Sequence, residues 1–139
     1  MKKGENPSKR PTWRQSEIDD TIRYRKAGYT VEPQVSFLDG KRCKNGISDS
    51  IRVDNYVEGL AAVEIKNYNL TTNSSGLVSN IVEQAIKHQQ HLPKGTRQIF
   101  KIDARGQVCT PELKSRIQEK IISNAQGILS KKDIFFIEN

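Results

Sequence analysis

The sequence predicts a single α/β domain in which a mixed central β-sheet, with an antiparallel meander, is flanked by helices. A chain of 139 residues is long enough for one hydrophobic core and too short for two independent ones. Short apolar runs typical of strands alternate with segments whose apolar residues recur at helical spacing. The expected order is helix, three strands, helix, strand, helix, strand, and a helix-covered mixed sheet is the simplest way to bury all these faces.

The chain is expected to begin with a basic flexible tail and a short helix. Residues 1–12, MKKGENPSKRPT, combine basic side chains with two prolines, a composition that orders poorly. The stretch from Ser16 to Gly28 indicates a helix with Ser16 as N-cap, acids in the first turn, bases in the last and Gly28 as its stop. Residues 13–139 are expected to form the folded domain.

Three strands in succession are expected to follow as an antiparallel meander. Residues 31–42 alternate loosely and contain the turn pair Asp39-Gly40, which predicts a strand running into a hairpin. Residues 47–53 form the second expected strand and residues 60–66 the third, with residues 55–59 connecting them.

The second half of the chain alternates helices and strands. Apolar residues recur at helical spacing from Leu77 to Ile86, and Pro93-Lys94-Gly95 ends that helix. Residues 98–103 predict a short strand. Thr110 is the expected N-cap of a last helix with a proline in its first turn, and residues 133–137 predict a buried closing strand.

The balance of charge favours a polyanionic partner. The formal net charge is +7 with 28% charged residues, and nucleic acid is the most frequent partner of such a surface. A basic protein without that role is the alternative. Cys43 and Cys109 show no zinc or disulfide spacing, which favours two free thiols. No apolar run approaches the roughly 20 residues of a membrane span, so none is expected.

The stretch VEIKNY, residues 63–68, contains the most informative pair of side chains. Glu64 and Lys66 are two apart on an expected strand and therefore project to one side, while Val63 and Ile65 project to the other. The run from Leu60 to Val63 predicts a strand buried on both faces, where an unpaired charge is costly.

A second carboxylate, Asp54, precedes this pair by one hairpin. Two convergent carboxylates form a site for a hard cation such as Mg²⁺ or Mn²⁺, and a nearby lysine can orient or deprotonate a nucleophile. The alternative is a buried salt bridge between Glu64 and Lys66, with Asp54 as an ordinary turn acid. Spacing and burial weigh these two interpretations about equally.

Asp54 followed ten residues later by Glu64-Ile65-Lys66 resembles the PD-(D/E)XK nuclease signature, with Val53 where that family usually has proline. The order of expected elements is similar to a restriction-endonuclease-like core. A broader likeness covers most of the chain from Trp13 onward and is to the C-terminal toxin domains of CdiA-type contact-dependent growth inhibition proteins. Its segments are residues 52–56, 63–69, 92–96 and 102–107.

The resemblance implies a metal-dependent endonuclease, with DNA as the first substrate and transfer RNA as the runner-up. Asp54 and Glu64 would hold Mg²⁺, with Mn²⁺ or Zn²⁺ as alternatives, and Lys66 would position the attacking water. The family often adds an acid from the first helix and a polar residue from the helix after the Glu-x-Lys strand, which suggests Glu17 as a further ligand and Gln84 as a further catalytic residue. Without the resemblance, Glu17 is better explained as a first-turn acid serving the helix dipole.

Four residues are expected to contact nucleic acid. Arg52 and Arg105 are the candidates for the phosphate backbone, although Arg105 is equally well explained by a structural pairing with Asp103. Tyr56 and Tyr68 flank the expected site and could stack on a base, but half-buried packing is the commoner role of such tyrosines.

The resemblance also implies a biological setting. A toxin domain of this kind would be secreted as the tip of a larger effector and act in the cytoplasm of the target bacterium, and a cognate acidic immunity protein would neutralise it. Two other classes stay open at this stage: a nucleic-acid-binding module without catalysis, and an interaction protein with a basic surface.

Overall fold

The fold is that of a single small α/β domain. The computed structural model describes residues 10–139, so residues 1–9 of the expected tail lie outside the described part. The elements are α1 (Trp13–Lys26), β1 (Val31–Leu38), β2 (Lys41–Cys43), β3 (Ile51–Val57), β4 (Ala61–Lys66), α2 (Ser74–His91), β5 (Gln98–Asp103), α3 (Pro111–Asn124), a short 3-10 helix (Lys131–Asp133) and β6 (Ile134–Ile137).

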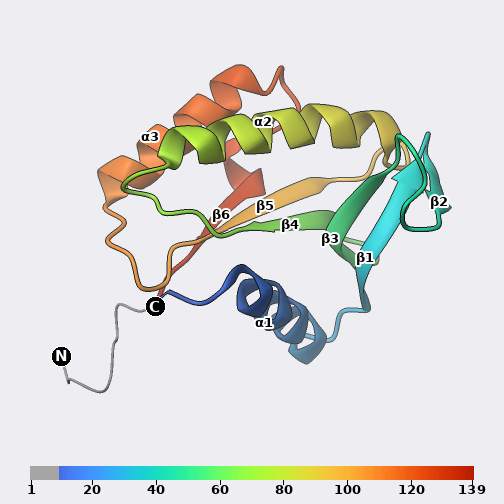
Figure 1. Cartoon of the computed structure of the whole chain (residues 1–139), viewed down its shortest axis with the longest axis horizontal. Helices are drawn as coiled ribbons and strands as arrows, with labels where there is room; N and C mark the ends of the chain where they lie inside the picture. The colour runs from blue at the N-terminus through green and yellow to red at the C-terminus, as the bar shows by residue number, and fades with distance from the viewer. Residues whose placement is uncertain (1–9) are drawn as a thin grey trace.

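Six strands form one mixed sheet in the order β2-β1-β3-β4-β5-β6. The pairs β1/β2, β1/β3 and β3/β4 are antiparallel, whereas β4/β5 and β5/β6 are parallel. The helices α2 and α3 make the two crossovers that parallel neighbours require (Figure 1). The predicted mixed sheet with its antiparallel meander is therefore confirmed.

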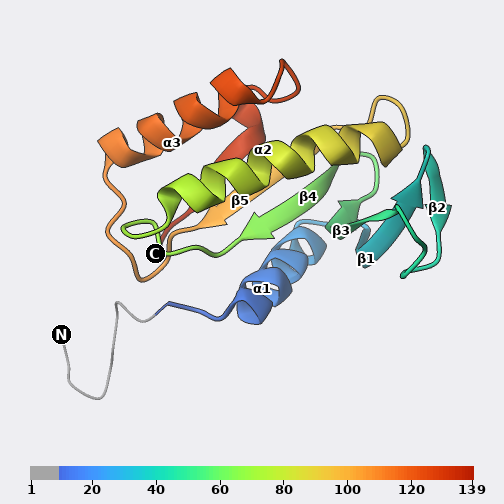
Figure 2. The same ribbon diagram turned by 45° about the horizontal axis from the view of Figure 1, so that its top comes forward.

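Helices cover both faces of the sheet, α1 on one side and α2 with α3 on the other (Figures 1 and 2). The largest apolar cluster joins α2 and α3 to β5, because each helix has apolar residues at helical spacing on its buried side. Its most deeply buried side chains include Leu77, Ile81, Phe100, Ile117 and Ile121.

The polarity of α1 is inverted relative to an ordinary surface helix. Its buried residues are Ser16, Asp20 and Tyr24. The helix begins three residues before the predicted N-cap, because the Thr12 side chain accepts a hydrogen bond from the Gln15 backbone N–H at 3.0 Å. Ser16 is thus an interior residue of the helix and not its cap, which corrects the expected helix start.

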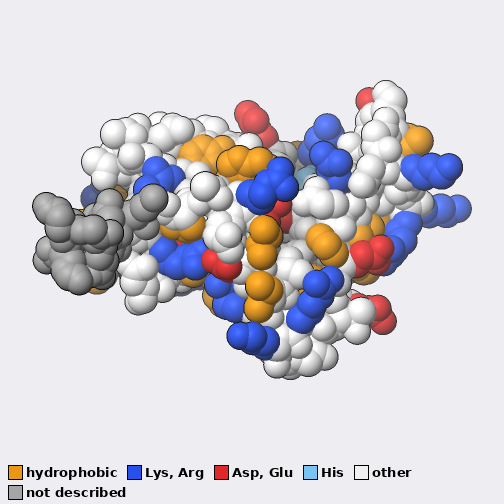
Figure 3. Space-filling view, turned by 60° about the horizontal axis from the view of Figure 1, so that its bottom comes forward, with side chains coloured by type: hydrophobic (Ala, Val, Ile, Leu, Met, Phe, Trp, Pro, Cys, Tyr) orange, Lys and Arg blue, Asp and Glu red, His pale blue; other side chains and the backbone are white. Residues whose placement is uncertain are grey.

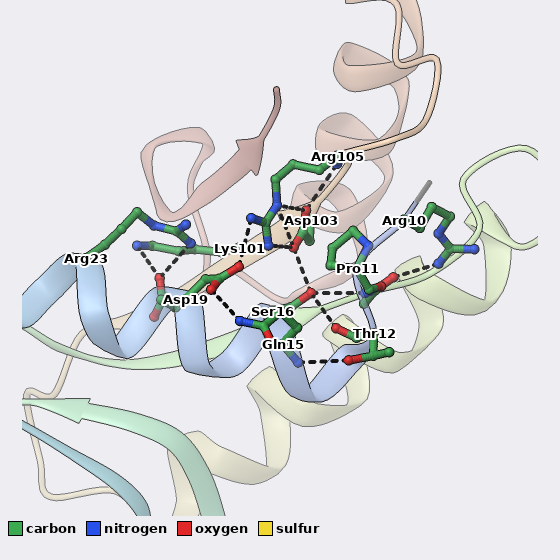
Figure 4. Close-up of polar contacts among 12 residues, drawn as sticks. Arg10, Pro11, Thr12, Gln15, Ser16, Asp19, Arg23, Lys101, Asp103 and Arg105 are labelled. Atoms are coloured by element: carbon green, nitrogen blue, oxygen red, sulfur yellow. Dashed lines mark hydrogen bonds and ion pairs between the residues drawn. The ribbon is translucent and has the colours of Figure 1, made fainter. Parts of the chain in front are cut away.

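Polar contacts at its N-terminal end attach α1 to the sheet (Figure 4). The Ser16 hydroxyl donates to the Asp103 carboxylate at 2.7 Å. Arg105 donates to the same carboxylate at 2.7 Å and reaches Asp19 on α1 at 2.9 Å. Asn67, just after β4, accepts from the Arg10 guanidinium at 2.6 Å and donates to the Pro11 carbonyl at 2.8 Å.

A second polar cluster attaches the middle of α1. The buried Asp20 carboxylate accepts from Lys101 Nζ of β5 at 2.8 Å and from the Asn55 side chain of β3 at 3.0 Å. Thr21 donates to the same Asn55 amide at 2.9 Å. Because these contacts come from β3 and β5 together, they fix both the height and the rotation of the helix over the sheet.

The predicted second strand is displaced in the structure. It was expected at residues 47–53, but β3 runs from Ile51 to Val57. The Ile47 carbonyl accepts from the Ser50 backbone and hydroxyl, which makes this stretch a turn. Residues 55–57, expected as a connection, pair with β1 and β4 on both sides, and these tertiary contacts override the local pattern.

The closing strand differs from its prediction in burial. The predicted strand corresponds to β6, which lies at the edge of the sheet and pairs with β5. The Phe135 side chain is 44% exposed. The strand was expected to be buried, but an edge position leaves one side of it to solvent.

Cys43 and Cys109 are both free. Within residues 10–139, no helix combines the length and apolar character needed to cross a membrane.

Replacing Asp103 by asparagine is expected to lower the free energy of unfolding by about 3 kcal/mol at neutral pH, because Arg105 and the buried Ser16 hydroxyl then face a neutral amide in place of the carboxylate to which they donate. Burial raises the pKa of Asp103, but hydrogen bonds from Arg105 and Ser16 outweigh it and hold the pKa below its ordinary value of 3.8. The carboxylate therefore stabilises the fold above that pH and loses its contribution as the pH falls through the folded-state pKa. Urea unfolding across this range should show the wild type approaching the variant in acid.

Glu119→Gln is the matched control, since Glu119 is an exposed acid on α3. It should change stability by less than about 0.5 kcal/mol. Equal losses in the two variants would contradict a specific role for Asp103.

Candidate functional site

Two carboxylates are held together at the point where the β3/β4 ladder ends. Asn55 and Val63 form the last backbone pair on that side. Beyond it, the Asp54 backbone N–H donates to Glu64 Oε2 and the Ile65 backbone N–H donates to Asp54 Oδ2, each at 2.9 Å. Side-chain oxygens thus replace the carbonyls of the ladder, and each carboxylate is fixed by the other strand's backbone.

Each of these carboxylates retains one oxygen that receives no hydrogen bond from residues 10–139 of the structure. Burial, followed by the neighbouring Asp54 charge, raises the pKa of Glu64 well above its ordinary value. Burial likewise raises the pKa of Asp54. A buried Glu64 beside a half-buried Asp54 of like charge is unfavourable alone and becomes favourable when a cation lies between the two carboxylates.

Lys66 lies beside the carboxylates without pairing to Glu64. Its Nζ donates to Gln84 Oε1 on α2, and no ion pair between Lys66 and Glu64 forms in the structure of residues 10–139. Val63 and Ile65 pack in the cluster under α1, so the predicted alternation of this strand is confirmed. Burial lowers the pKa of the Lys66 ammonium, which favours proton exchange at its Nζ.

Glu17 extends from α1 toward the same place. Because the helix begins at Trp13, Glu17 lies in its second turn and the structure has no acid in the first turn, so a dipole role does not account for it. Burial and then the Asp54 charge raise the pKa of Glu17 to about 7. Its carboxylate accepts from the Gln34 side chain at 3.4 Å.

Gln34 has a strained backbone at the edge of the site. Its φ is +59°, a left-handed conformation that is uncommon for a residue with a side chain. On β1 it lies between Pro33, which pairs with Asn55, and Val35, which pairs with Val53. Gln34 is therefore opposite Asp54 of β3. Strain of this kind costs about 1 to 3 kcal/mol and is found mainly where function requires it.

Glu17, Gln34, Asp54 and Glu64 line one cleft of about 790 Å³, whose lining comes from α1, β1, β3, β4 and Gln84 of α2. Figure 3 brings the α1 side forward and shows hydrophobic side chains among Lys and Arg side chains there. Lys66 does not line the cleft itself but donates to Gln84, which does. The polar residues of the lining are Arg14, Glu17, Thr21, Arg25, Gln34, Arg52, Asp54, Asn55, Glu64 and Gln84. The structure therefore brings together the residues for which the sequence predicted metal binding and catalysis.

Of the four residues expected to contact nucleic acid, only Arg52 lines the cleft. Tyr56 packs against Phe37 at 5.3 Å between ring centres, with the Arg42 guanidinium at 5.5 Å from its ring. Tyr68 packs on the large cluster under α2 and α3. Arg105 is paired with acids, as its structural alternative proposed.

Sequence reasoning missed two kinds of cleft residue. Gln34 has no local signal, because its conformation depends on pairing with β3. Trp13, Ile18 and Ile22 also line the cleft, and a signal for two of them was present: Ile18 and Ile22 fall on the helix face opposite Ser16 and Asp20.

The donor set fits Mg²⁺ or Mn²⁺ better than Zn²⁺. Within residues 10–139, no cluster of three or more His, Cys, Asp or Glu side chains is close enough to hold one metal ion. Two carboxylates with a free oxygen each match Mg²⁺, which keeps several waters and takes one or two protein carboxylates. Zinc in proteins usually takes three or four nitrogen or sulfur ligands.

Glu64→Gln is expected to stabilise the metal-free protein by about 0.5 to 2 kcal/mol at neutral pH, because it removes a repelled buried charge. The raised folded-state pKa means that the wild type loses stability as the pH rises above the ordinary value of 4.5, whereas the variant does not. Thermal unfolding in EDTA across that range measures the difference.

Added Mg²⁺ should stabilise the wild type by about 2.7 kcal/mol at a hundred times its dissociation constant. The same titration should leave Glu64→Gln nearly unchanged. Equal stabilisation of the two proteins would place the cation elsewhere.

Comparisons of the chain with models of protein families, with curated proteins and with solved structures each return no match. Its function is therefore inferred from the cleft and from the resemblance of its motif.

Proposed function

We propose that the protein is a metal-dependent endonuclease that hydrolyses phosphodiester bonds, with DNA as the preferred substrate and transfer RNA as the alternative. The observation that carries the proposal is the mutual fixing of the Asp54 and Glu64 carboxylates, beside Lys66, at the floor of a cleft. Arginines on the cleft walls supply the positive charge that phosphates require. They are Arg14, Arg25 and Arg52.

Each residue has a distinct role in this proposal. Asp54 and Glu64 would hold the cation, which when bound would lower the pKa of a water molecule and offset charge on the phosphate oxygens. Lys66 Nζ orients the attacking water and accepts or shares its proton, as its lowered pKa allows. Gln84 holds that ammonium in position through its side-chain oxygen. Glu17 does not bind the cation directly in this proposal. Its carboxyl group takes up a proton or contacts the cation through a water molecule.

The proposed chemistry agrees with the arrangement of the strands. A restriction-endonuclease-like core carries its acids on an antiparallel pair followed by a helix crossover, and here the acids lie on β3 and β4 with α2 following. We include that narrower fold assignment in the proposal.

The biological setting extends the same proposal. The resemblance to toxin tips supports a role in competition between bacteria, as part of a larger secreted effector that acts in the target cytoplasm. The net charge of +7 favours a partner of opposite charge, which supports an acidic immunity protein.

Purified protein is expected to cleave plasmid DNA, heat-denatured DNA or total transfer RNA with Mg²⁺ or Mn²⁺, and EDTA should stop cleavage. Glu64→Gln and Lys66→Met should each lower the rate by about a thousandfold or more, because each removes a group that acts on the reacting atoms. Gel assays over a time course measure the rates.

Asp49→Asn is the control for this experiment, because Asp49 is an exposed acid outside the cleft whose positive φ asparagine tolerates. It should retain full activity. Absence of cleavage of all three substrates would refute the nuclease assignment, and intact nucleic-acid binding with Glu64→Gln indistinguishable from wild type would indicate a non-catalytic binding module.

Expression of the protein should arrest bacterial growth, and co-expression of a small acidic protein encoded by the neighbouring open reading frame should restore it. The Glu64→Gln variant should be tolerated without that partner. Growth curves measure the effect, and a wild-type protein tolerated alone would contradict the toxin role.

A further inference from the structure

Three large apolar side chains of α1 are exposed to solvent and do not pack in the core of the domain. Trp13 is 60% exposed, and Ile18 and Ile22 are each 44% exposed. All three line the cleft that holds the carboxylates. The buried residues of the helix, which pack on the sheet, are Ser16, Asp20 and Tyr24. Burial in the domain core therefore does not explain why these apolar residues are present.

Cations accompany these apolar side chains along the cleft. The Arg14 guanidinium lies 5.2 Å from the centre of the Trp13 ring. Arg25 and Arg52 line the same cleft, and both are exposed. An aromatic ring with cations beside it is the combination that binds unpaired nucleotides, since a base stacks on the ring while the cations take the phosphates.

We propose that the cleft takes a single-stranded or looped segment of nucleic acid, with one unpaired base stacked on Trp13 and the strand continuing along the cleft past Ile18 and Ile22. This inference rests on the proposed function, because it names the form of substrate that reaches Asp54 and Glu64.

The dimensions of the cleft favour an unpaired strand over a duplex. Its volume of about 790 Å³ falls within the roughly 300 to 1,000 Å³ of pockets that enclose small ligands. One or two nucleotides fit such a space. A duplex keeps its bases stacked and presents mainly phosphates, so it offers no partner for the three apolar side chains.

The test measures binding in EDTA, so that it does not depend on cleavage. Fluorescence anisotropy with labelled single-stranded DNA and RNA should give dissociation constants at least about tenfold lower than those for duplexes of the same sequence. Trp13 is the only tryptophan of the chain, so base stacking should quench the intrinsic fluorescence of the protein. Trp13→Ala should weaken single-strand binding by about tenfold or more, and Trp13→Phe should restore most of the affinity.

Phe135→Ala is the matched control, because Phe135 is a similarly exposed aromatic residue on the edge strand β6. It should bind single strands like the wild type, and circular dichroism should show that both alanine variants are folded. Equal affinity for duplex and single strand, absence of quenching, or equal effects of Trp13→Ala and Phe135→Ala would each overturn the inference.

Two further outcomes separate this inference from its neighbours. Single-strand binding that depends on Trp13, without cleavage of any substrate, would support the binding site and refute the nuclease assignment. If Trp13→Ala instead abolishes binding of the acidic immunity protein and leaves single-strand affinity unchanged, the face docks a protein and the inference is overturned.

Discussion

The exchange of hydrogen bonds between Asp54 and Glu64 is the constraint on which the rest of the site depends. Each carboxylate is fixed by the backbone of the neighbouring strand at 2.9 Å, so neither can swing away without leaving a backbone N–H unpaired. The cost is a buried Glu64 and a half-buried Asp54 whose pKa values are raised. A fixed pair of oxygens with excess negative charge is a preorganised cation site, and preorganisation of this kind is what catalysis by a metal requires.

The second constraint is the polar attachment of α1. Asp20 and Ser16 face the sheet, where Lys101, Asn55 and Asp103 satisfy them. Buried polar contacts of this kind are directional, so they fix rotation more strictly than an apolar interface does. The same rotation directs Glu17 toward Asp54 and leaves Ile18 and Ile22 at the cleft. The helix therefore serves as a wall of the site as much as a layer of the core.

The domain is basic overall, but its cleft contains several acidic side chains. The chain as a whole carries +7, while the cleft holds three carboxyl groups whose pKa values are raised. A basic surface draws a polyanion toward the molecule, and the acids would repel it at the floor unless a cation intervened. The left-handed backbone of Gln34 adds strain at the same place. Stability is lowered locally where the proposed chemistry occurs, a common feature of active sites.

The sequence by itself determined the elements that depend on local signals: the Thr110-Pro111 cap, the Asp39-Gly40 turn, the apolar stripe of α2, and the buried strand that carries Glu64 and Lys66 on one side. It also indicated that Asp54 and Glu64 would converge. Only the tertiary structure decided the start of β3, the inward position of Ser16, the conformation of Gln34 and the pairing of Arg105. Each of these depends on partners far along the chain, and such contacts override local propensity because the free energy of burying and pairing polar groups exceeds it.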